Sequence, residues 1–252
     1  MNKGGLICNV VYKSNMKLPL ICLVLFLIAL FEFLILLKHD IFKNALIERG
    51  FIKQNPEERM DYQCLLGWEN SLVKMNYKAD VCFIGNSITY GSDFQKDFPN
   101  KKIVNLGYSG DRIEGMIIRQ KQISAVKPDK IFVMAGINDL SKSYMNDKLF
   151  HDSFCDLVDS IQNNNPTSRL YLQSILPVNH KMNTSLCSSE RILKANLMIK
   201  EIAEKRNAFF IDLYSLYADD NNELPEKYTY DGLHLYPNSY DIWRDAIRKY
   251  MD

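Results

Sequence analysis

The amino-acid sequence predicts an α/β fold: a parallel sheet of five strands with helices on both faces, preceded by one apolar N-terminal helix. Three observations support this prediction. Five short apolar runs have the length and composition of strands. Longer segments with helical periodicity separate these runs. Nearly continuous apolar strands that alternate with helices are typical of a parallel sheet covered on both faces.

The predicted strands and helices follow one another in a regular order. The strands are expected at 81–84, 102–106, 131–135, 170–175 and 208–213, and a glycine directly follows each of the first three. The helices are expected at 112–126, 148–163 and 188–206, and a last amphipathic helix contains Trp243. Ligands of such sheets bind at the carboxyl ends of the strands, so polar residues just after the strands are candidates for function.

An apolar segment precedes the sheet. The stretch from Leu18 to Leu37 contains a single charge, Glu32, and Lys17 and Lys38 border it. A helix of this length rises ~30 Å, the thickness of the hydrocarbon core of a bilayer. A cleaved signal peptide should be shorter and followed by a small-residue cleavage site, and a buried soluble helix should show a polar face. The sequence therefore favours an uncleaved single-span membrane anchor.

The anchor divides the chain into four predicted parts. They are a short N-terminal tail at 1–17, the transmembrane anchor at 18–37, a linker or helical stalk at 38–78, and a globular domain at 79–252. Lysines and arginines nearly balance across the span, so the positive-inside rule does not orient it. A short tail before a large domain resembles a signal anchor. We therefore expect a single-pass membrane protein with its domain on the extracytoplasmic side.

The composition argues against several classes of function. Lys and Arg number 31 and Asp and Glu number 30, a net charge of +1 that gives no electrostatic basis for binding nucleic acid. Hydrophobic residues make up 47% and aromatic residues 12%, which indicates a folded chain. The six cysteines include no C-x-x-C pair, so a zinc ribbon or thioredoxin-type site is not expected. Cysteines of the globular part are interpreted as buried apolar residues.

Residues with catalytic chemistry follow the predicted strands at one edge of the sheet. Ser87 follows the first strand, Gly110 the second and Asn138 the third, while Asp231 and His234 lie between the fifth strand and the last helix. His234 can accept the hydroxyl proton of Ser87, and Asp231 can orient the imidazole and stabilise its cation. The N–H groups of Ser87 and Gly110 and the Asn138 amide can stabilise an oxyanion. Each residue alone has a plainer explanation as a turn or cap, but the combination indicates nucleophilic catalysis.

Four sequence blocks resemble those of the SGNH, or GDSL, hydrolase superfamily across about residues 79–252. The blocks are GNSIT at 85–89, NLGYSGD at 105–111, GIND at 136–139 and DGLHL at 231–235. The resemblance implies a three-layer α/β/α sandwich with Ser87, Asp231 and His234 as the catalytic residues. It implies an oxyanion hole formed by Ser87, Gly110 and Asn138. It also implies an esterase, lipase, thioesterase or carbohydrate O-deacetylase that needs no metal, and no cofactor is expected.

Two positions depart from related patterns. Asn86 stands where the family usually has aspartate. Asparagine is nearly isosteric and both donates and accepts hydrogen bonds, so we expect activity to survive with altered local electrostatics. Thr89 replaces the second glycine of G-x-S-x-G, which argues against the sharp nucleophile elbow of the α/β-hydrolase fold.

The sequence thus predicts a membrane-anchored serine ester hydrolase that forms an acyl-enzyme and acts on a small-molecule or glycan ester. An anchor near envelope polymers favours short acyl groups on sugars. Two alternatives stay open: an acyltransferase to a glycan with the same catalytic residues, and a catalytically silent binding module, which Asn86 alone supports. Tyr228, Tyr230 and Tyr236 flank the Asp–His block. They are candidates for lining a sugar or acyl pocket, although packing is the simpler interpretation.

Overall fold

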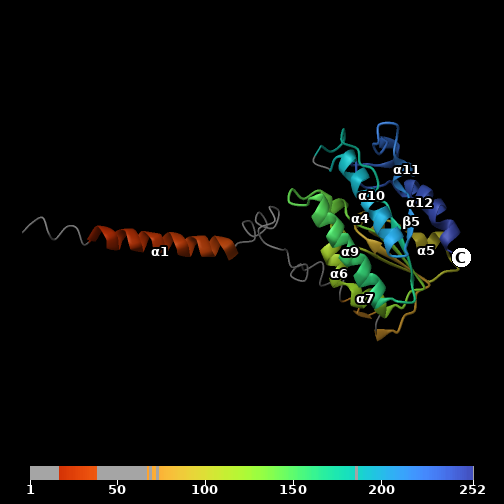
Figure 1. Ribbon diagram of the computed structural model, residues 1–252, viewed down its shortest axis with the longest axis horizontal. Helices are drawn as coiled ribbons and strands as arrows, with labels where there is room; N and C mark the ends of the chain where they lie inside the picture. The colour runs from red at the N-terminus through yellow and green to blue at the C-terminus, as the bar shows by residue number, and fades with distance from the viewer. Residues whose placement is uncertain (1–16, 39–66, 68–69, 72–73, 185–186, 252) are drawn as a thin grey trace, which may run out of the picture. The chain divides into compact units, whose positions relative to one another are not determined.

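The structure is a computed structural model of the chain, and it describes residues 17–38, 67, 70–71, 74–184 and 187–251. The chain divides into two compact units, Met1–Gln54 and Asn55–Asp252. The first unit contains helix α1, Lys17–Lys38 (Figure 1). The second unit contains the sheet. The predicted linker at 38–78 lies largely outside the described residues, and the boundaries of the four predicted parts stay predictions.

Helix α1 covers the predicted apolar segment and one further residue at each end. Its side chains are described for residues 22–33, and large apolar ones are exposed, among them Phe26 and Phe31. Counting only what the structure describes, no helix is both long and apolar enough to cross a membrane. The structure therefore does not confirm the predicted span from Leu18 to Leu37, which stays a prediction.

The second unit is built on a five-stranded sheet in which all neighbouring strands are parallel, as predicted (Figure 1). The strands are β1 (Val81–Gly85), β2 (Ile103–Gly107), β3 (Lys130–Met134), β4 (Arg169–Gln173) and β5 (Phe209–Ile211), in the order β2-β1-β3-β4-β5. Strand β5 is shorter than predicted. The N–H groups of Leu213 and Tyr214 donate to Ser174 Oγ, so the chain has left the sheet by that point.

Helices cover both faces of the sheet (Figure 1). One buried cluster joins alternate strand residues, such as Ile84 and Val133, to α6 (Ile113–Ile118), α7 (Gln120–Ala125), α9 (Asp147–Asn164) and α10 (Ser189–Lys205). The other joins the residues between them, such as Phe83 and Phe132, to α4 (Ser87–Tyr90), α5 (Phe94–Asp97) and α12 (Tyr240–Ile247). The remaining short helices are α8 (Ile137–Leu140), α11 (Tyr214–Tyr217), η3 (Glu226–Tyr228), η4 (Pro237–Ser239) and η5 (Arg248–Tyr250).

The helix predicted at 112–126 is in fact two helices. Helix α6 ends at Ile118, α7 begins at Gln120, and Arg119 lies between them with φ −84° and ψ 5°. The side chain of Arg119 is completely buried and bonds to the loop after β2. Helical periodicity marks an arginine as exposed and gives no signal of this break. The other two long helices differ from the prediction by one residue at each end.

Aromatic side chains connect four strands on the face covered by α4, α5 and α12. The register pairs Phe83 with Phe132, Phe132 with Tyr171, and Tyr171 with Phe209. Their ring centroids lie 5.0, 4.5 and 5.0 Å apart, and each pair is stacked. Such pairs stabilise a sheet beyond simple burial and hold the strand ends in register.

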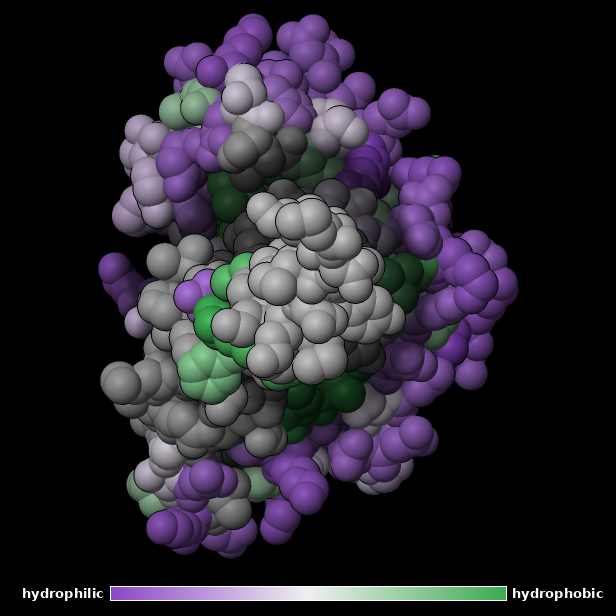
Figure 2. All heavy atoms as spheres, turned by 90° about the vertical axis from the view of Figure 1, so that its left-hand side faces the viewer, coloured by the Kyte–Doolittle hydropathy of each residue, from purple (hydrophilic) through white to green (hydrophobic). Residues whose placement is uncertain are grey.

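Hydrophilic side chains dominate the periphery of the view in Figure 2, as expected when apolar ones pack between layers.

The described cysteines of this unit agree with the interpretation as buried apolar residues. Cys82, Cys155 and Cys187 are all buried. Burial raises the pKa of the Cys155 and Cys187 thiols, which disfavours the reactive thiolate. Cys64 lies outside the described residues.

Candidate active site

The strand order places a topological switch point between β1 and β3. Strand β1 lies between β2 and β3, and the chain proceeds first to β2 on one side and then to β3 on the other. Loops leaving neighbouring strands therefore diverge, which creates the usual ligand-binding position of open α/β sheets. Ser87 follows β1 and Asn138 follows β3 at this position.

Ser87 is the first residue of helix α4, directly after β1. Asn86 caps this helix, because its Oδ1 accepts the N–H of Ile88 at 2.9 Å, and its side chain is buried. An aspartate oxygen would accept the same bond. Helix α4 also packs tightly on the sheet, since a Cβ on Gly107 would lie 2.3 Å from Tyr90 N. Capping and close packing together fix the position of the Ser87 hydroxyl.

Ser87 and His234 come together although they lie 147 positions apart in the sequence. Ser87 Oγ lies 2.9 Å from His234 Nε2. His234 Nδ1 lies 2.6 Å from Asp231 Oδ2. If Nδ1–H donates to the carboxylate, Nε2 is left as the acceptor for the serine hydroxyl. The structure thus joins the three residues predicted to be catalytic in one hydrogen-bonded chain.

A rigid loop carries the Asp–His pair. Asp231 Oδ1 accepts the N–H groups of Leu233 at 3.0 Å and His234 at 2.7 Å. Gly232 has φ +87°, a conformation that favours glycine, and its N–H donates to Thr229 Oγ1. An antiparallel bridge between Thr229 and Leu235 closes the loop. The spacing of the D-x-x-H motif therefore lets one carboxylate bind both the ring and the backbone of the histidine.

The electrostatics of Asp231 suit the orientation of a histidine. Burial raises the pKa of the Asp231 carboxyl, but hydrogen bonds from the His234 ring and from the backbone of His234 and Leu233 outweigh it. The net pKa is lowered, so the group is an anion at neutral pH. An anion beside Nδ1 favours a positive charge on the imidazole, which a general base acquires when it accepts a proton.

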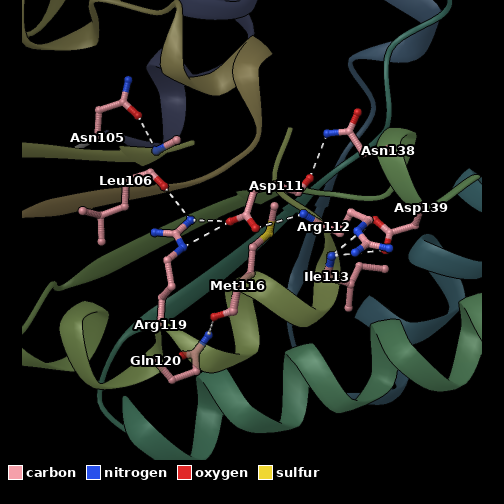
Figure 3. Close-up of polar contacts among 11 residues, drawn as sticks. Asn105, Leu106, Asp111, Arg112, Ile113, Met116, Arg119, Gln120, Asn138 and Asp139 are labelled. Atoms are coloured by element: carbon pink, nitrogen blue, oxygen red, sulfur yellow. Dashed lines mark hydrogen bonds and ion pairs between the residues drawn. The ribbon is translucent and has the colours of Figure 1, made fainter. Parts of the chain in front are cut away.

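The predicted oxyanion residues Gly110 and Asn138 lie on adjoining segments. Gly110 follows β2 with φ +74°, a conformation that favours glycine. Asn138 lies in α8 after β3, and its Nδ2 donates to the backbone oxygen of Asp111 at 2.8 Å (Figure 3). This bond connects the Asn138 amide to the residue directly after Gly110. The structure therefore brings both predicted donors to the same loop.

A buried ion pair supports that loop, and the sequence did not reveal it. Arg119 donates through Nε and Nη2 to Asp111 Oδ2 at 3.1 and 2.9 Å, and through Nη2 to the Leu106 oxygen at 2.9 Å (Figure 3). The side chains of Arg119 and Asp111 are 0% and 5% exposed. A Cβ on Gly115 would lie 2.0 Å from Asp111 Oδ1, so this glycine makes room for the carboxylate. In the sequence, the only sign of this ion pair is the spacing of Asp111, Gly115 and Arg119.

Asp139 is a second buried carboxyl beside the loop. Both of its oxygens lie 3.3 Å from the N–H of Ile113, at the start of α6 (Figure 3). Burial raises the pKa of Asp139 to about 7, against weaker opposing effects of the Ile113 bond and of Arg112. Sequence reasoning treated this residue only as part of a turn or cap. The structure makes it a neutral or half-ionised group within the fold near pH 7.

Asp139 should make the stability of the protein depend on pH. Its folded pKa of about 7 lies above the ordinary value of 3.8, so the folded state holds a proton that the unfolded state releases. The free energy of unfolding should therefore fall as pH rises from 4 to 7, by at most about 4 kcal/mol from this group, and level off above. Asp139→Asn should remove that contribution. In urea denaturation from pH 5 to 8, the free energy of unfolding of the variant should rise relative to that of the wild type as the pH increases. An identical pH dependence of the two proteins would contradict the raised pKa of Asp139.

A serine paired with a histidine and an aspartate, at the carboxyl edge of a parallel sheet, is an arrangement that occurs in ester hydrolases. This chain belongs to the GDSL-like lipase/acylhydrolase family, whose sequence model matches residues 83–242. The resemblance predicted from the four blocks is confirmed. The protein is accordingly a carboxylic ester hydrolase.

Solved structures of other proteins share the fold. A Streptococcus pneumonia protein described as a platelet activating factor is 25% identical, with a TM-score of 0.63 over 77% of this chain and 99% of that one. An acylhydrolase from Bacteroides fragilis is 24% identical, with a TM-score of 0.61 over 73% and 96%. An acetyl xylan esterase from Geobacillus stearothermophilus is 20% identical, with a TM-score of 0.55 over 70% and 97%. The last two likenesses concern the fold alone.

One curated relative matches a large part of the chain. It is the N-acylneuraminate cytidylyltransferase of Escherichia coli O18:K1:H7, which is 27% identical over 175 residues. The match covers 67% of this chain, but the chain spans only about two fifths of the length of that relative, 39%.

Proposed function

We propose that the protein hydrolyses esters with Ser87 as nucleophile, His234 as general base and acid, and Asp231 as the group that orients the histidine. The observation that carries this proposal is the hydrogen-bonded chain from Ser87 Oγ through the His234 ring to Asp231, with distances of 2.9 and 2.6 Å. Membership of a family of lipases and acylhydrolases supports the same reaction.

The proposed reaction has two steps. In the first, Ser87 Oγ bonds to the acyl carbon while its proton passes to His234 Nε2. The carbon–oxygen bond to the alcohol then breaks, and the leaving oxygen takes that proton. In the second, water gives a proton to His234 and bonds to the acyl carbon. Ser87 Oγ leaves and recovers the proton, which releases the carboxylic acid and restores the enzyme.

We propose that the oxyanion of each step binds to the N–H groups of Ser87 and Gly110 and to the Asn138 amide. Asn138 uses one N–H to hold the Asp111 oxygen. An amide carries two N–H groups, so the second can donate to the oxyanion. The ion pair of Arg119 and Asp111 positions this loop, because it fixes the residue that Asn138 binds.

The substrate class proposed is a short-chain ester of a small molecule or a glycan. The relative that matches this chain is named for N-acylneuraminate, a sugar. The test is a panel of purified-protein assays with acetyl, butyryl and octanoyl p-nitrophenyl esters, acetylated xylan and O-acetylated N-acetylneuraminate. We expect the acetyl esters to be turned over fastest. A rate that rises steadily with acyl length would contradict the proposal of a short acyl group.

The same panel separates hydrolysis from the two alternatives. Product analysis with and without a glycan acceptor identifies acyl transfer, because an acyltransferase would esterify the acceptor instead of releasing free acid. A silent binding module would turn over none of the esters, and a fluorophosphonate probe would leave Ser87 unmodified.

We propose further that the segment from Leu18 to Leu37 anchors the protein in a membrane, with the hydrolase domain on the extracytoplasmic side. Its support is a helix of 22 residues that exposes apolar side chains in its described part. Extraction of membranes with alkaline carbonate should leave the protein in the pellet, and protease added to intact cells should digest the domain. Release by carbonate would contradict the anchor, and protection from protease would contradict the orientation.

A further inference from the structure

Two exposed tyrosines lie on the loop that carries the Asp–His pair. Tyr230 directly precedes Asp231, and Tyr236 follows His234 by two residues. The Thr229–Leu235 bridge closes this loop, and the Tyr236 N–H donates to the Tyr228 oxygen at 2.9 Å. The two tyrosines therefore lie on the same hydrogen-bonded loop as the proposed catalytic base.

The structure separates these two tyrosines from the third one in the motif. Tyr228 packs against the buried cluster, with its ring edge-on to Tyr217 at 5.7 Å. Tyr230 and Tyr236 are instead 55% and 39% exposed. The packing interpretation thus holds for Tyr228. It does not explain why two large aromatic rings face solvent beside the site.

The rings are arranged around the histidine. The Tyr230 ring is nearly parallel to the His234 ring, at 14° with centroids 5.9 Å apart. The Tyr236 ring is tilted by 56° to that of Tyr230, with centroids 5.8 Å apart. Together they form an angled aromatic surface that adjoins the imidazole, which we name the tyrosine platform.

The tyrosine platform lies where the alcohol portion of an ester substrate is expected. In the proposed reaction His234 Nε2 gives its proton to the leaving alcohol oxygen, so the alcohol portion must lie beside this ring. In the same proposal the acyl oxygen binds instead to the N–H groups of Ser87 and Gly110 and to the Asn138 amide. A sugar ring suits the platform, because its C–H groups pack on aromatic faces while its hydroxyls bond to the tyrosine hydroxyls or to water. A long alkyl alcohol would gain less, because the exposed rings would leave it in water.

We propose that the tyrosine platform, Tyr230 with Tyr236, is a binding site for the pyranose ring of a glycan ester on the leaving-group side of Ser87. This proposal rests on the proposed function and adds the chemistry of the alcohol. Tyr230 is then a specificity-determining residue, because it selects the alcohol without taking part in bond breaking.

The test compares two acetate esters that differ only in the alcohol: mono-O-acetylated methyl β-xylopyranoside and ethyl acetate, both followed by acid release. The wild type should prefer the sugar ester. Tyr230→Ala should lower kcat/KM for the sugar ester about tenfold, mainly through KM, and change that for ethyl acetate less than about twofold. Tyr230→Phe should retain most of the preference. Leu216→Ala, which alters an exposed apolar side chain outside the platform, should change neither ester.

Three kinetic results would overturn the platform. The wild type could show no preference for the sugar ester, Tyr230→Ala could leave that preference intact, or it could reduce both esters equally, which would mean that the ring only positions His234. A binding measurement keeps the test independent of turnover. Saturation-transfer NMR should show that methyl β-xylopyranoside binds to the Ser87→Ala protein. This binding should be lost in the double variant that also carries Tyr230→Ala. Absence of binding to Ser87→Ala would also overturn the platform. Failure of the proposed function looks different: both esters would be inert, or Ser87→Ala would stay active.

Discussion

Replacement of Ser87 by alanine should lower kcat for acetyl ester hydrolysis by about 10³-fold to 10⁶-fold, with KM little changed. The substitution removes the atom proposed to form the acyl-enzyme, Ser87 Oγ, which lies 2.9 Å from His234 Nε2. The oxyanion donors remain, so a small residual rate is expected. The measurement is steady-state hydrolysis of p-nitrophenyl acetate by the purified protein.

Matched variants show whether a loss is specific to the site. Ser124→Ala removes a hydroxyl from α7 that bonds only locally, to the Lys121 oxygen at 3.1 Å, and should keep the wild-type rate. His234→Ala should be as impaired as Ser87→Ala, whereas His151→Ala, on α9, should not be. Wild-type rates in folded Ser87→Ala protein would remove Ser87 from the mechanism.

The second large effect concerns stability. Arg119→Met should lower the free energy of unfolding by about 3 to 5 kcal/mol, because it leaves the Asp111 carboxylate buried without its charged partner. The pair is almost entirely inaccessible to solvent, at 0% and 5% exposure. Urea denaturation measures the change. Arg248→Met breaks an exposed pair with Asp245 and should cost less than about 1 kcal/mol.

A double variant separates stability from positioning. Adding Asp111→Asn to Arg119→Met removes the unpaired charge and should restore much of the lost stability. The loop that carries Gly110 would still lack the hydrogen bonds from Arg119, so kcat should stay reduced while KM changes little. Full recovery of kcat together with stability would show that the pair has no positioning role, and Arg119→Met as stable as wild type would contradict its structural role.

The placement of the candidate catalytic residues could be predicted because it depends on topology. Strands of a parallel sheet end at one edge, so residues after the first strand and near the last helix meet even when 147 positions separate them. The consequence of Asn86 could be predicted in part. Its oxygen caps α4, a contact that asparagine and aspartate make equally well.

The buried charges could not be predicted. Charged residues are normally exposed, and the sequence does not show that Arg119 interrupts a helix to reach Asp111. The burial of Asp139 depends on the tertiary fold, which brings its carboxyl to the Ile113 N–H at the start of α6. The tyrosines were ambiguous for a similar reason. The loop geometry packs a partly buried Tyr228 against the core and exposes Tyr230, and the sequence pattern does not show this division.

The most direct test of the central proposal is identification of the residue that a fluorophosphonate probe modifies. Peptide mass spectrometry of the labelled protein should place the adduct on Ser87, and labelling should be lost in Ser87→Ala and slowed strongly in His234→Ala. An adduct on another serine, or labelling that persists at the wild-type rate in Ser87→Ala, would contradict the assignment of Ser87 as the nucleophile.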